Sequence, residues 1–363
     1  LQDVLTCIRK HTTLSQAGLN LFQNAERYLK SPNEMARLFK NYPRALIRTQ
    51  EIAHAAGNFS LNELTYEYPE EVCPKHLSPQ VHLTNLAWSN ANKRYPKGIP
   101  EKVSHQIEHE LQLIGELNYA KYFLTVYDII LFAQSKNILC QGRGAAANSA
   151  VCYVLGITAV DPNYINLFFE RFISKERNEP PDIDIDFEHE RREEVIQYIY
   201  QKYGRHRAAL TATVITYRSR SAVRDIGKVF DLDLEAIENI SKLFTRSEEA
   251  EFSIDDFRKR GLNPEDFKIR KTVELVRLLK TFPRHLSQHV GGFIISQEKL
   301  SSIVPIENAA MPDRTVIEWD KDDIEKMGML KIDVLGLGML TCIRKSLELL
   351  NDSKQPIPVS YTH

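Results

Sequence analysis

The chain has 363 residues, more than twice the usual size of one domain, so two or three structural units are expected. Its 47 basic and 48 acidic side chains leave a formal charge of −1, which excludes a uniformly basic protein that wraps nucleic acid but allows a basic groove beside an acidic site. The most apolar stretch, near residues 150–160, is about half as long as a membrane span requires, so no membrane association is expected.

The ends and the cysteines of the chain carry further expectations. No signal-peptide pattern opens the sequence, and five scattered cysteines without a C-x-x-C pair predict buried thiols in a reducing compartment. A cytoplasmic protein is therefore expected. Because the chain begins without Met and stops at His363 in mid-pattern, we expect it to be part of a longer protein.

Residues 1–56 are expected to be helical, with a helix start at Ser31-Pro32-Asn33-Glu34, where a capping Ser precedes a Pro. An irregular stretch follows to about residue 98. Helical periodicity returns from Pro100, and the apolar residues of two successive helices recur at three- and four-residue intervals. These residues are Val103, Ile107, Leu111 and Ile114, and then Phe123, Val126, Ile129, Ile130 and Phe132.

A glycine loop is predicted after a short strand at residues 137–140. The loop is Gln141-Gly142-Arg143-Gly144, and small residues and an apolar helix come next. A strand, a glycine turn and a helix N-terminus can together bind an anion, because free N–H groups and the helix dipole both favour negative charge. The loop lacks the Gly-Lys-Ser/Thr of a Walker A motif, and a tight turn for close packing explains the glycines equally well.

An aspartate run is the most informative local pattern. Residues 180–187, PPDIDIDF, alternate as a β-strand, which places Asp182, Asp184 and Asp186 on one face and the apolar residues on the other. Three carboxylates about 6.5–7 Å apart repel one another unless a cation lies between them. Mg²⁺ prefers such hard oxygen ligands, so the run predicts a metal site. The alternative is the solvated face of an edge strand.

A basic segment follows the acidic one. Residues 176–194 hold nine acidic and three basic side chains, whereas residues 191–228 hold nine basic and three acidic ones. Tyrosines lie among the arginines of this segment. The pattern suits a substrate whose phosphates extend away from an acidic metal site, although a solvated helical face has the same composition. The arginines are Arg205, Arg207, Arg218, Arg220 and Arg224.

Helices are predicted from residue 229 to about residue 284, with another start at Asn263-Pro264-Glu265. The predicted apolar stripe of this region comprises Leu232, Leu234, Ile237, Ile240 and Leu243. His285 and His289 precede a Gly-Gly pair and are expected to be structural or to contact substrate rather than to share a metal. Near residue 331, Lys331 and Asp333 lie on one face of a short strand.

Four segments in this order resemble the bacterial C-family DNA polymerases, the alpha subunits of the DNA polymerase III type. The segments are QGRGAAANS, FFERFISKERNEPPDIDIDF, YGRHRAALTATVITYRSRSAVRDIGK and HVGGFIIS…EWDKDDIEKMGMLKIDVLGLGML. The resemblance covers residues 25–350, and HLSQHVGG and VPIENAAMPDRTVIEWDKDD are most similar to the error-prone, damage-inducible branch.

This resemblance implies an α+β fold with a palm similar to the polymerase-beta-type nucleotidyltransferases and an inserted helical thumb. The implied palm covers residues 57–213 and 289–341, the thumb 214–288, and the start of the fingers 342–363. Residues 1–56 would link a preceding phosphoesterase-like domain to the palm.

The resemblance also implies roles for single residues. Asp182, Asp184 and Asp333 would be the catalytic metal ligands for two Mg²⁺ ions, with Mn²⁺ as a substitute. Asp186 and His289 would have supporting roles, and the five arginines named above would contact DNA. The incoming triphosphate would be contacted by Arg143, Gly144, Ala145, Arg171 and Lys331. Many relatives have Ser where this chain has Ala145, so a hydroxyl contribution is lost here.

The implied function is template-directed DNA synthesis from deoxynucleoside triphosphates on a primer–template DNA, in error-prone translesion synthesis during the DNA damage response. A sliding clamp and accessory subunits would bind regions outside this sequence, the protein would be associated with the bacterial nucleoid, and the isolated chain would be inactive. Two alternatives remain open from the residues: a metal-dependent nuclease or phosphohydrolase, and a non-catalytic DNA-binding module.

Overall fold

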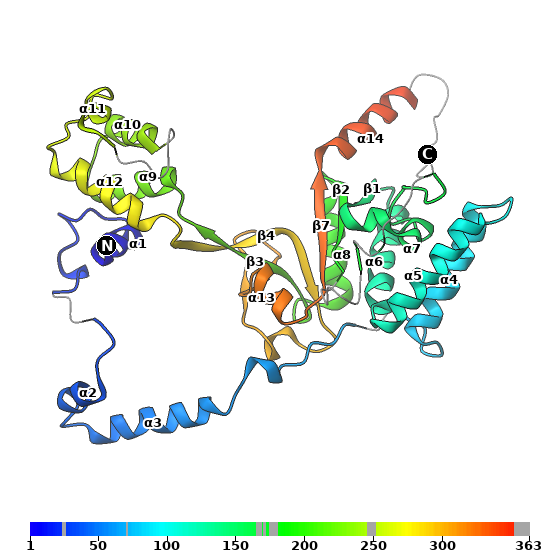
Figure 1. The fold of residues 1–363 in the computed structure, drawn as a ribbon, viewed down its shortest axis with the longest axis horizontal. Helices are drawn as coiled ribbons and strands as arrows, with labels where there is room; N and C mark the ends of the chain where they lie inside the picture. The colour runs from blue at the N-terminus through cyan, green and yellow to red at the C-terminus, as the bar shows by residue number, and fades with distance from the viewer. Residues whose placement is uncertain are drawn as a thin grey trace. The chain divides into compact units, whose positions relative to one another are not determined.

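A computed structural model describes residues 1–23, 27–69, 72–164, 169, 172–173, 181–244 and 252–351. The chain forms two compact units, and it passes between them once after Ser60 and twice within long strands (Figure 1). The helical unit comprises Leu1–Ser60 and Val214–Leu286, and the sheet unit comprises Leu61–Thr213 and Ser287–His363. The predicted α+β class is confirmed. Within the described ranges, every helix is too short or too polar to cross a lipid bilayer.

The helical unit is built around the predicted apolar stripe. Its main helices are α1 (Gln2–Lys10), α2 (Pro32–Leu38), α3 (Pro43–Gly57), α9 (Ser219–Val229), α10 (Leu234–Phe244), α11 (Ile254–Arg258) and α12 (Phe267–Leu279). Ile237, Ile240 and Leu243 are buried against α9 and α12, as predicted. Leu234 is 78% exposed, because it is the first residue of α10 and faces away from this core.

Two boundaries of this unit differ from the predictions. The helix expected at Asn263 begins at Phe267, because Asp266 caps it by accepting hydrogen bonds from the N–H groups of Lys268 and Ile269. The side chain of Asn263 instead accepts from the N–H of Glu265 in a turn. The helical prediction up to residue 284 is wrong, since a strand begins at Pro283.

The sheet unit contains one mixed sheet of seven strands. The strands are β1 (Cys140–Arg143), β2 (Ile183–Glu188), β3 (Ala208–Thr216), β4 (Pro283–Ile295), β5 (Ile306–Asn308), β6 (Thr315–Ile317) and β7 (Lys331–Leu337). Their order is β1-β2-β7-β4-β3-β6-β5. The pairs β2–β7 and β3–β6 are parallel, and β1–β2, β4–β7 and β5–β6 are antiparallel.

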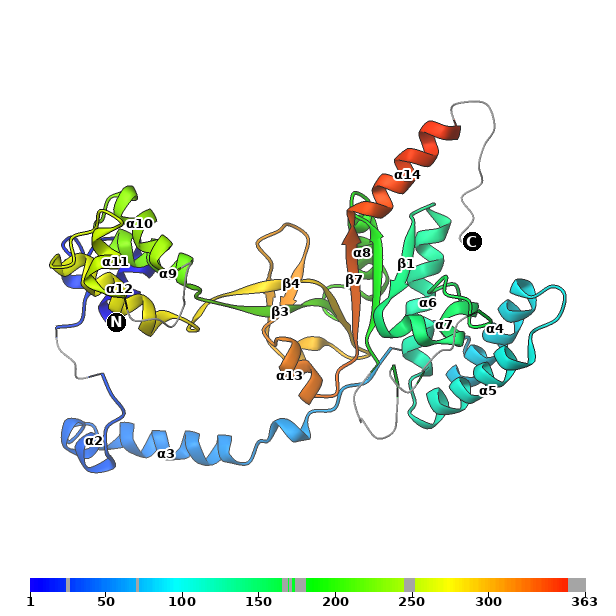
Figure 2. The ribbon, with the colours of Figure 1, turned by 45° about the horizontal axis from the view of Figure 1, so that its top comes forward.

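Helices pack against the β1–β2–β7 part of this sheet, as the two views of Figures 1 and 2 show. The helices and 3-10 turns of the unit include α4 (Pro79–Arg94), α5 (Glu101–Glu116), α6 (Ala120–Ser135), η3 (Gly144–Asn148), α7 (Ala150–Val154), α8 (Arg192–Tyr203), α13 (Lys321–Lys326) and α14 (Gly338–Asn351). The predicted apolar faces of α5 and α6 are buried in the largest core cluster. Phe132 is half-buried, with its ring stacked on Tyr198 at 4.0 Å.

Candidate functional site

The aspartate run forms an interior strand of the sheet. β2 pairs with β1 on one side and with β7 on the other, so the alternative of a solvated edge strand is wrong. Ile183, Ile185 and Phe187 are fully buried on one face, which confirms the predicted alternation. Asp182 lies just before the strand and is exposed, and Asp184 is half-buried.

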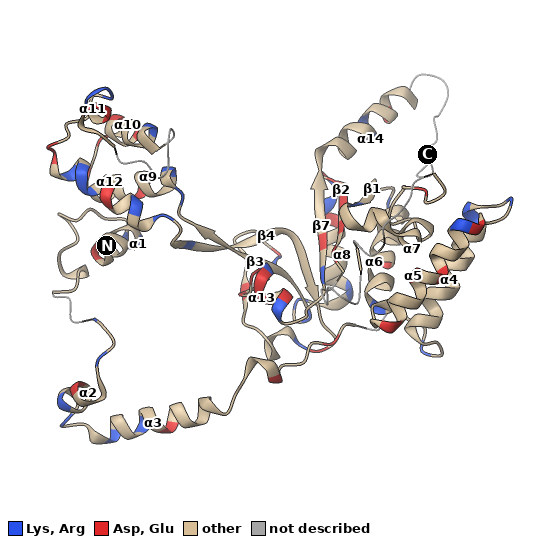
Figure 3. Cartoon of the chain, in the orientation of Figure 1, with Lys and Arg blue, Asp and Glu red and all other residues tan. Residues whose placement is uncertain are grey.

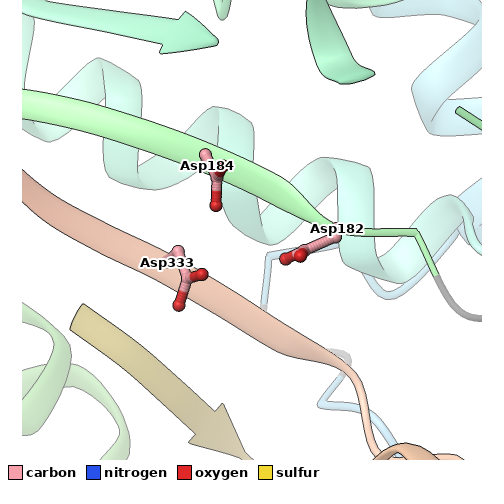
Figure 4. A group of neighbouring side chains, drawn as sticks. All are labelled: Asp182, Asp184 and Asp333. Atoms are coloured by element: carbon pink, nitrogen blue, oxygen red, sulfur yellow. The ribbon is translucent and has the colours of Figure 1, made fainter. Parts of the chain in front are cut away.

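Asp333 comes to the same place from the neighbouring strand. The parallel register pairs Asp184 with Asp333 directly. One carboxylate oxygen from each of Asp182, Asp184 and Asp333 lies within 4.8 Å of the other two (Figure 4). Residues about 150 positions apart in sequence therefore form one acidic cluster, which we call the aspartate cluster.

Lys331 neutralises part of this cluster. Its ammonium lies 3.2 Å from Oδ1 of Asp182 and contacts Oδ2 of Asp333 more closely. Burial alone would lower the pKa of Lys331, but the carboxylates of Asp333 and Asp182 outweigh it and raise that pKa above its ordinary value. Lys331 and Asp333 share one face of β7, as predicted. The lysine is thus a charged group at every physiological pH.

The other oxygen of Asp333 lacks a partner. Oδ1 of Asp333 is buried without a hydrogen bond among the described residues. Nδ1 of His289 lies 3.7 Å away, but this nitrogen accepts the N–H of Gly292 at 2.8 Å and so carries no proton for Asp333. Burial also lowers the pKa of His289. The pair is therefore not an ion pair, and the orphaned oxygen can accept a cation.

The cluster resists full ionisation when no cation is bound. Burial, the contact with Asp333 and the charge of Asp182 raise the pKa of Asp184 to about 6. Three converging carboxylates, one of them with a raised pKa, and the buried oxygen of Asp333 without a hydrogen bond fit a hard divalent cation, which prefers oxygen ligands.

Asp186 does not belong to the cluster, although it follows the same alternation. Its Oδ2 lies 3.1 Å from Nε of Arg143 on β1, and its side chain is largely buried. Arg143 is directly opposite Asp184 in the β1–β2 register, and its side chain is half-exposed. The expected supporting role of Asp186 and the expected triphosphate contact of Arg143 stay predictions.

The glycine loop lies next to Asp184 but begins later than predicted. The strand predicted at residues 137–140 is formed by Cys140–Arg143, so Gly142 is inside β1. A Cβ at Gly142 would come within 2.5 Å of the carbonyl oxygen of Ile157. Gly144 has φ +66°, and a Cβ there would lie 3.5 Å from Oδ2 of Asp184. Gly144 and Ala145 open the 3-10 turn η3, whose first N–H groups have no partner within the turn.

The helix after this loop does not offer free N–H groups to an anion. Glu110 of α5, fully buried, accepts the N–H of Ala150 at 2.8 Å, the N–H of Val151 at 2.9 Å and the hydroxyl of Ser149 at 2.7 Å. Burial raises the pKa of Glu110 to about 7 despite these hydrogen bonds. The first N–H groups of α7 are therefore already bonded to Glu110. An anion at this loop would have to bind the N–H groups of η3 instead.

Two of these functional residues carried a sequence signal that was missed. Glu110 falls on the apolar face of α5, three residues after Ile107, where a carboxylate needs a partner. Gly292 is opposite Asp333 on β4, and a Cβ there would come within 2.9 Å of Cδ of Lys331. The Gly-Gly pair is visible in the sequence, but the space that Gly292 leaves for the side chain of Lys331 was not expected from it.

The predicted DNA-binding arginines are divided between the two units. In the sheet unit, Arg207 donates to the carbonyl oxygen of Ser296 at 2.9 Å, and Arg205 donates to that of Asp313 at 2.7 Å. Arg218, Arg220 and Arg224 are exposed at the start of α9 in the helical unit. Basic and acidic residues alternate over α9 to α12 (Figure 3). Arg171 lies outside the described residues.

His285 and His289 do not form a pair. Both lie on β4, where residues four apart point to the same face but are too far apart to share a metal ion. His285 is exposed, and His289 is half-buried beside the aspartate cluster.

Comparisons with known proteins agree with the resemblance in the sequence. The family described as "Bacterial DNA polymerase III alpha NTPase domain" matches residues 81–336. The chain is 54% identical over 354 residues to the error-prone DNA polymerase of Bradyrhizobium diazoefficiens, covering 98% of this chain and 31% of that protein. It is 57% identical over 349 residues to that of Saccharophagus degradans, covering 96% of this chain and 34% of that protein. The chain thus spans about a third of the length of the curated relatives it matches.

Proposed function

We propose, from the premise that this chain belongs to the bacterial DNA polymerase III alpha family, that it supplies the catalytic palm of a template-directed DNA polymerase. The observation that carries the proposal is the convergence of Asp182, Asp184 and Asp333 beside Lys331. The relatives named above are error-prone DNA polymerases, which confirms the branch that the sequence resembles. A role in translesion synthesis, in the bacterial cytoplasm at the nucleoid, is part of this proposal.

The sheet unit would be the palm, similar to the polymerase-beta-type nucleotidyltransferases. This assignment is supported by two adjacent parallel strands, β2 and β7, that carry the aspartates near their first residues. Residues 214–288 would be the inserted thumb, a proposal supported by the assignment of Val214–Leu286 to the helical unit, and α14 would lead into the fingers. Sliding-clamp and accessory-subunit contacts would lie in parts of the longer relatives that this chain does not match.

The reaction joins a primer to a nucleotide. The 3′-oxygen of the primer forms a bond to the α-phosphorus of a deoxynucleoside triphosphate, the bond to the bridging oxygen breaks, pyrophosphate leaves, and the hydroxyl proton passes to solvent. Two Mg²⁺ ions, or Mn²⁺ in their place, would stabilise the charge on the attacking and leaving oxygens when bound. Asp182, Asp184 and Asp333 would hold these ions.

The remaining groups of the site would orient the triphosphate. Lys331 is held between two carboxylates and carries a full positive charge, so it can offset charge on the phosphates. The first N–H groups of η3, at Gly144 and Ala145, lie next to Asp184 and can donate to a phosphate oxygen. His289, with Nδ1 occupied by backbone N–H groups, carries its proton on Nε2 and is a neutral donor.

The test is primer extension by a full-length polymerase that contains this chain. Asp184→Asn and Asp333→Asn should each reduce extension by about 10³-fold or more, because each removes a ligand of the aspartate cluster. Asp186→Asn is the matched control on the same strand. It should cost much less, since Asp186 pairs with Arg143 outside the cluster.

Other outcomes would favour the alternatives. Cleavage of DNA in Mg²⁺ without any triphosphate, abolished by Asp184→Asn, would indicate a nuclease. DNA binding without extension, unchanged by Asp184→Ala, would indicate a non-catalytic binding module.

A further inference from the structure

The hydroxyl of Tyr122 lies where β2 and β7 begin to pair. Tyr122 belongs to α6, and its side chain is fully buried. Its hydroxyl donates to the carbonyl oxygen of Lys331 at 2.9 Å and accepts the N–H of Ile183, also at 2.9 Å. One side chain therefore bonds the backbones of both strands at their first residues.

This position is next to the groups that form the site. Ile183 directly follows Asp182, and Lys331 is the first residue of β7. The parallel register begins with Ile183 opposite Ile332, so the amide of Ile183 and the carbonyl of Lys331 face each other across the pair. The hydroxyl lies between these two groups. It thus sets how closely the strands approach on the side where Asp182 and Lys331 lie.

The ring of Tyr122 is held firmly. It makes edge contacts with Tyr68 at 5.8 Å and with Phe123 at 6.1 Å between ring centroids. Burial and the charge of Asp182 raise the pKa of Tyr122, so the hydroxyl keeps the proton that it donates. A planar ring with two side-chain torsions, packed on both sides, acts as a rigid spacer between α6 and the strand ends.

We propose that Tyr122 is a positioning residue, which fixes the separation of β2 and β7 at their first residues and thereby the spacing of Asp182, Lys331 and Asp333. It touches neither metal nor substrate. The inference rests on the proposed function, because the spacing matters only if the aspartate cluster holds divalent ions. The position of the Tyr122 hydroxyl between the two strands is observed directly, from its hydrogen bonds to Lys331 and Ile183.

The test compares Tyr122→Phe with Tyr200→Phe in the 363-residue chain. Tyr200 is a matched control, because its buried hydroxyl also joins a backbone carbonyl and a backbone N–H, those of Thr315, at 3.1 and 3.0 Å. Thr315 is on β6, three strands away from β7 in the sheet order. Both variants lose a buried hydroxyl that bonds one backbone carbonyl and one backbone N–H, but only the hydroxyl of Tyr122 joins two strands and lies beside the cluster.

Titration with Mn²⁺, followed by calorimetry, is the main readout. Tyr122→Phe should weaken Mn²⁺ binding by about tenfold, the usual effect of losing a hydrogen bond that orients metal ligands, whereas Tyr200→Phe should bind as the unchanged chain does. Thermal melting should fall in both variants. Equal Mn²⁺ affinity in Tyr122→Phe and the unchanged chain, or an equal loss in Tyr200→Phe, would overturn the proposal.

Kinetics in a full-length polymerase containing this chain give a second readout. Tyr122→Phe should raise the Mg²⁺ concentration needed for half-maximal extension and lower kcat, with KM for DNA unchanged. A raised KM for DNA with unchanged metal requirement would contradict the positioning role. Failure of the proposed function would show separately, as full extension by Asp184→Asn in the same assay.

Discussion

Lys331 gives the aspartate cluster its own counterion. The ammonium lies between Asp182 and Asp333, so two carboxylates share a positive charge before any metal arrives. Asp184 is the member whose pKa is raised, to about 6, because burial and the neighbouring carboxylates outweigh the charge of Arg143. The three aspartates therefore differ in their charged neighbours, which the sequence alternation does not show.

Metal binding should depend on pH through Asp184. A metal ligand must be deprotonated, so a proton competes with the ion at every pH below about 6. Mn²⁺ affinity should rise by up to about tenfold per pH unit from pH 5 to 6 and level off above about 7. Calorimetric titrations across this range measure the effect.

The same shift acts on stability with the opposite sign. A carboxyl whose pKa is raised on folding contributes stability that is present below its unfolded pKa of about 4 and is lost as pH rises through about 6. Acid should thus weaken metal binding and stabilise this part of the metal-free fold. Asp184→Asn, which cannot titrate, should flatten both profiles; an unchanged pH dependence in that variant would assign the effect to another group.

Sequence alternation identified the cluster but could not select its members. Asp184 and Asp186 share one face of β2 and Asp182 directly precedes the strand; the neighbouring strands determine which of the three belong to the cluster. Asp333 on β7 lies close to Asp182 and Asp184, whereas Arg143 on β1 forms an ion pair with Asp186. Strand order across the sheet depends on contacts between distant residues, so a local pattern does not contain this information.

Glu110 shows how one helix holds the start of another. Its carboxylate receives three buried donors from residues 149–151, and these residues directly follow η3. Through Glu110, α5 thereby fixes the chain where η3 ends and α7 begins. This contact explains why a short helix of five residues, α7, is stable at this point.

Glu110→Ala should lower the free energy of unfolding by about 3 kcal/mol, because several buried donors lose their acceptor together. Urea unfolding followed by circular dichroism measures the change. Glu108→Ala is the control on the same helix, where the side chain is exposed, and should change stability by less than about 0.5 kcal/mol. Equal effects of the two substitutions would contradict the capping role.

Elements with a clear apolar period were predictable, whereas α4 (Pro79–Arg94) was missed within the stretch predicted to be irregular. α5, α6 and β2 follow their apolar periods because one face of each is buried in the core. The helical prediction ran to about residue 284 and so included the first two residues of β4, because residues 283–286 are exposed and exposed residues carry no alternation. The extent of β1 was missed because Gly142 was predicted to be in a turn. A glycine is needed there because any Cβ would collide with the carbonyl oxygen of Ile157.

The chain by itself should not extend primers. It matches about a third of the length of its curated relatives, and we propose that parts of the nucleotide and template site lie in the remainder. Extension of a labelled primer with Mg²⁺ and four deoxynucleoside triphosphates should stay at background for the 363-residue chain and be robust for a full-length polymerase. Extension by the short chain that disappears in Asp184→Asn would show that the site is complete without those parts.

α14 is attached to both aspartate strands at once. It continues directly from β7, since Leu337 ends the strand and Gly338 begins the helix (Figure 1). Arg344 of this helix also bonds Glu188, the last residue of β2, at 2.5 Å, and Glu188 is fully buried. Pulling the helix away would leave a carboxylate uncompensated inside the protein. A displacement of α14 would therefore move β2 and β7 together. Asp184 and Asp333 would then keep their register relative to each other.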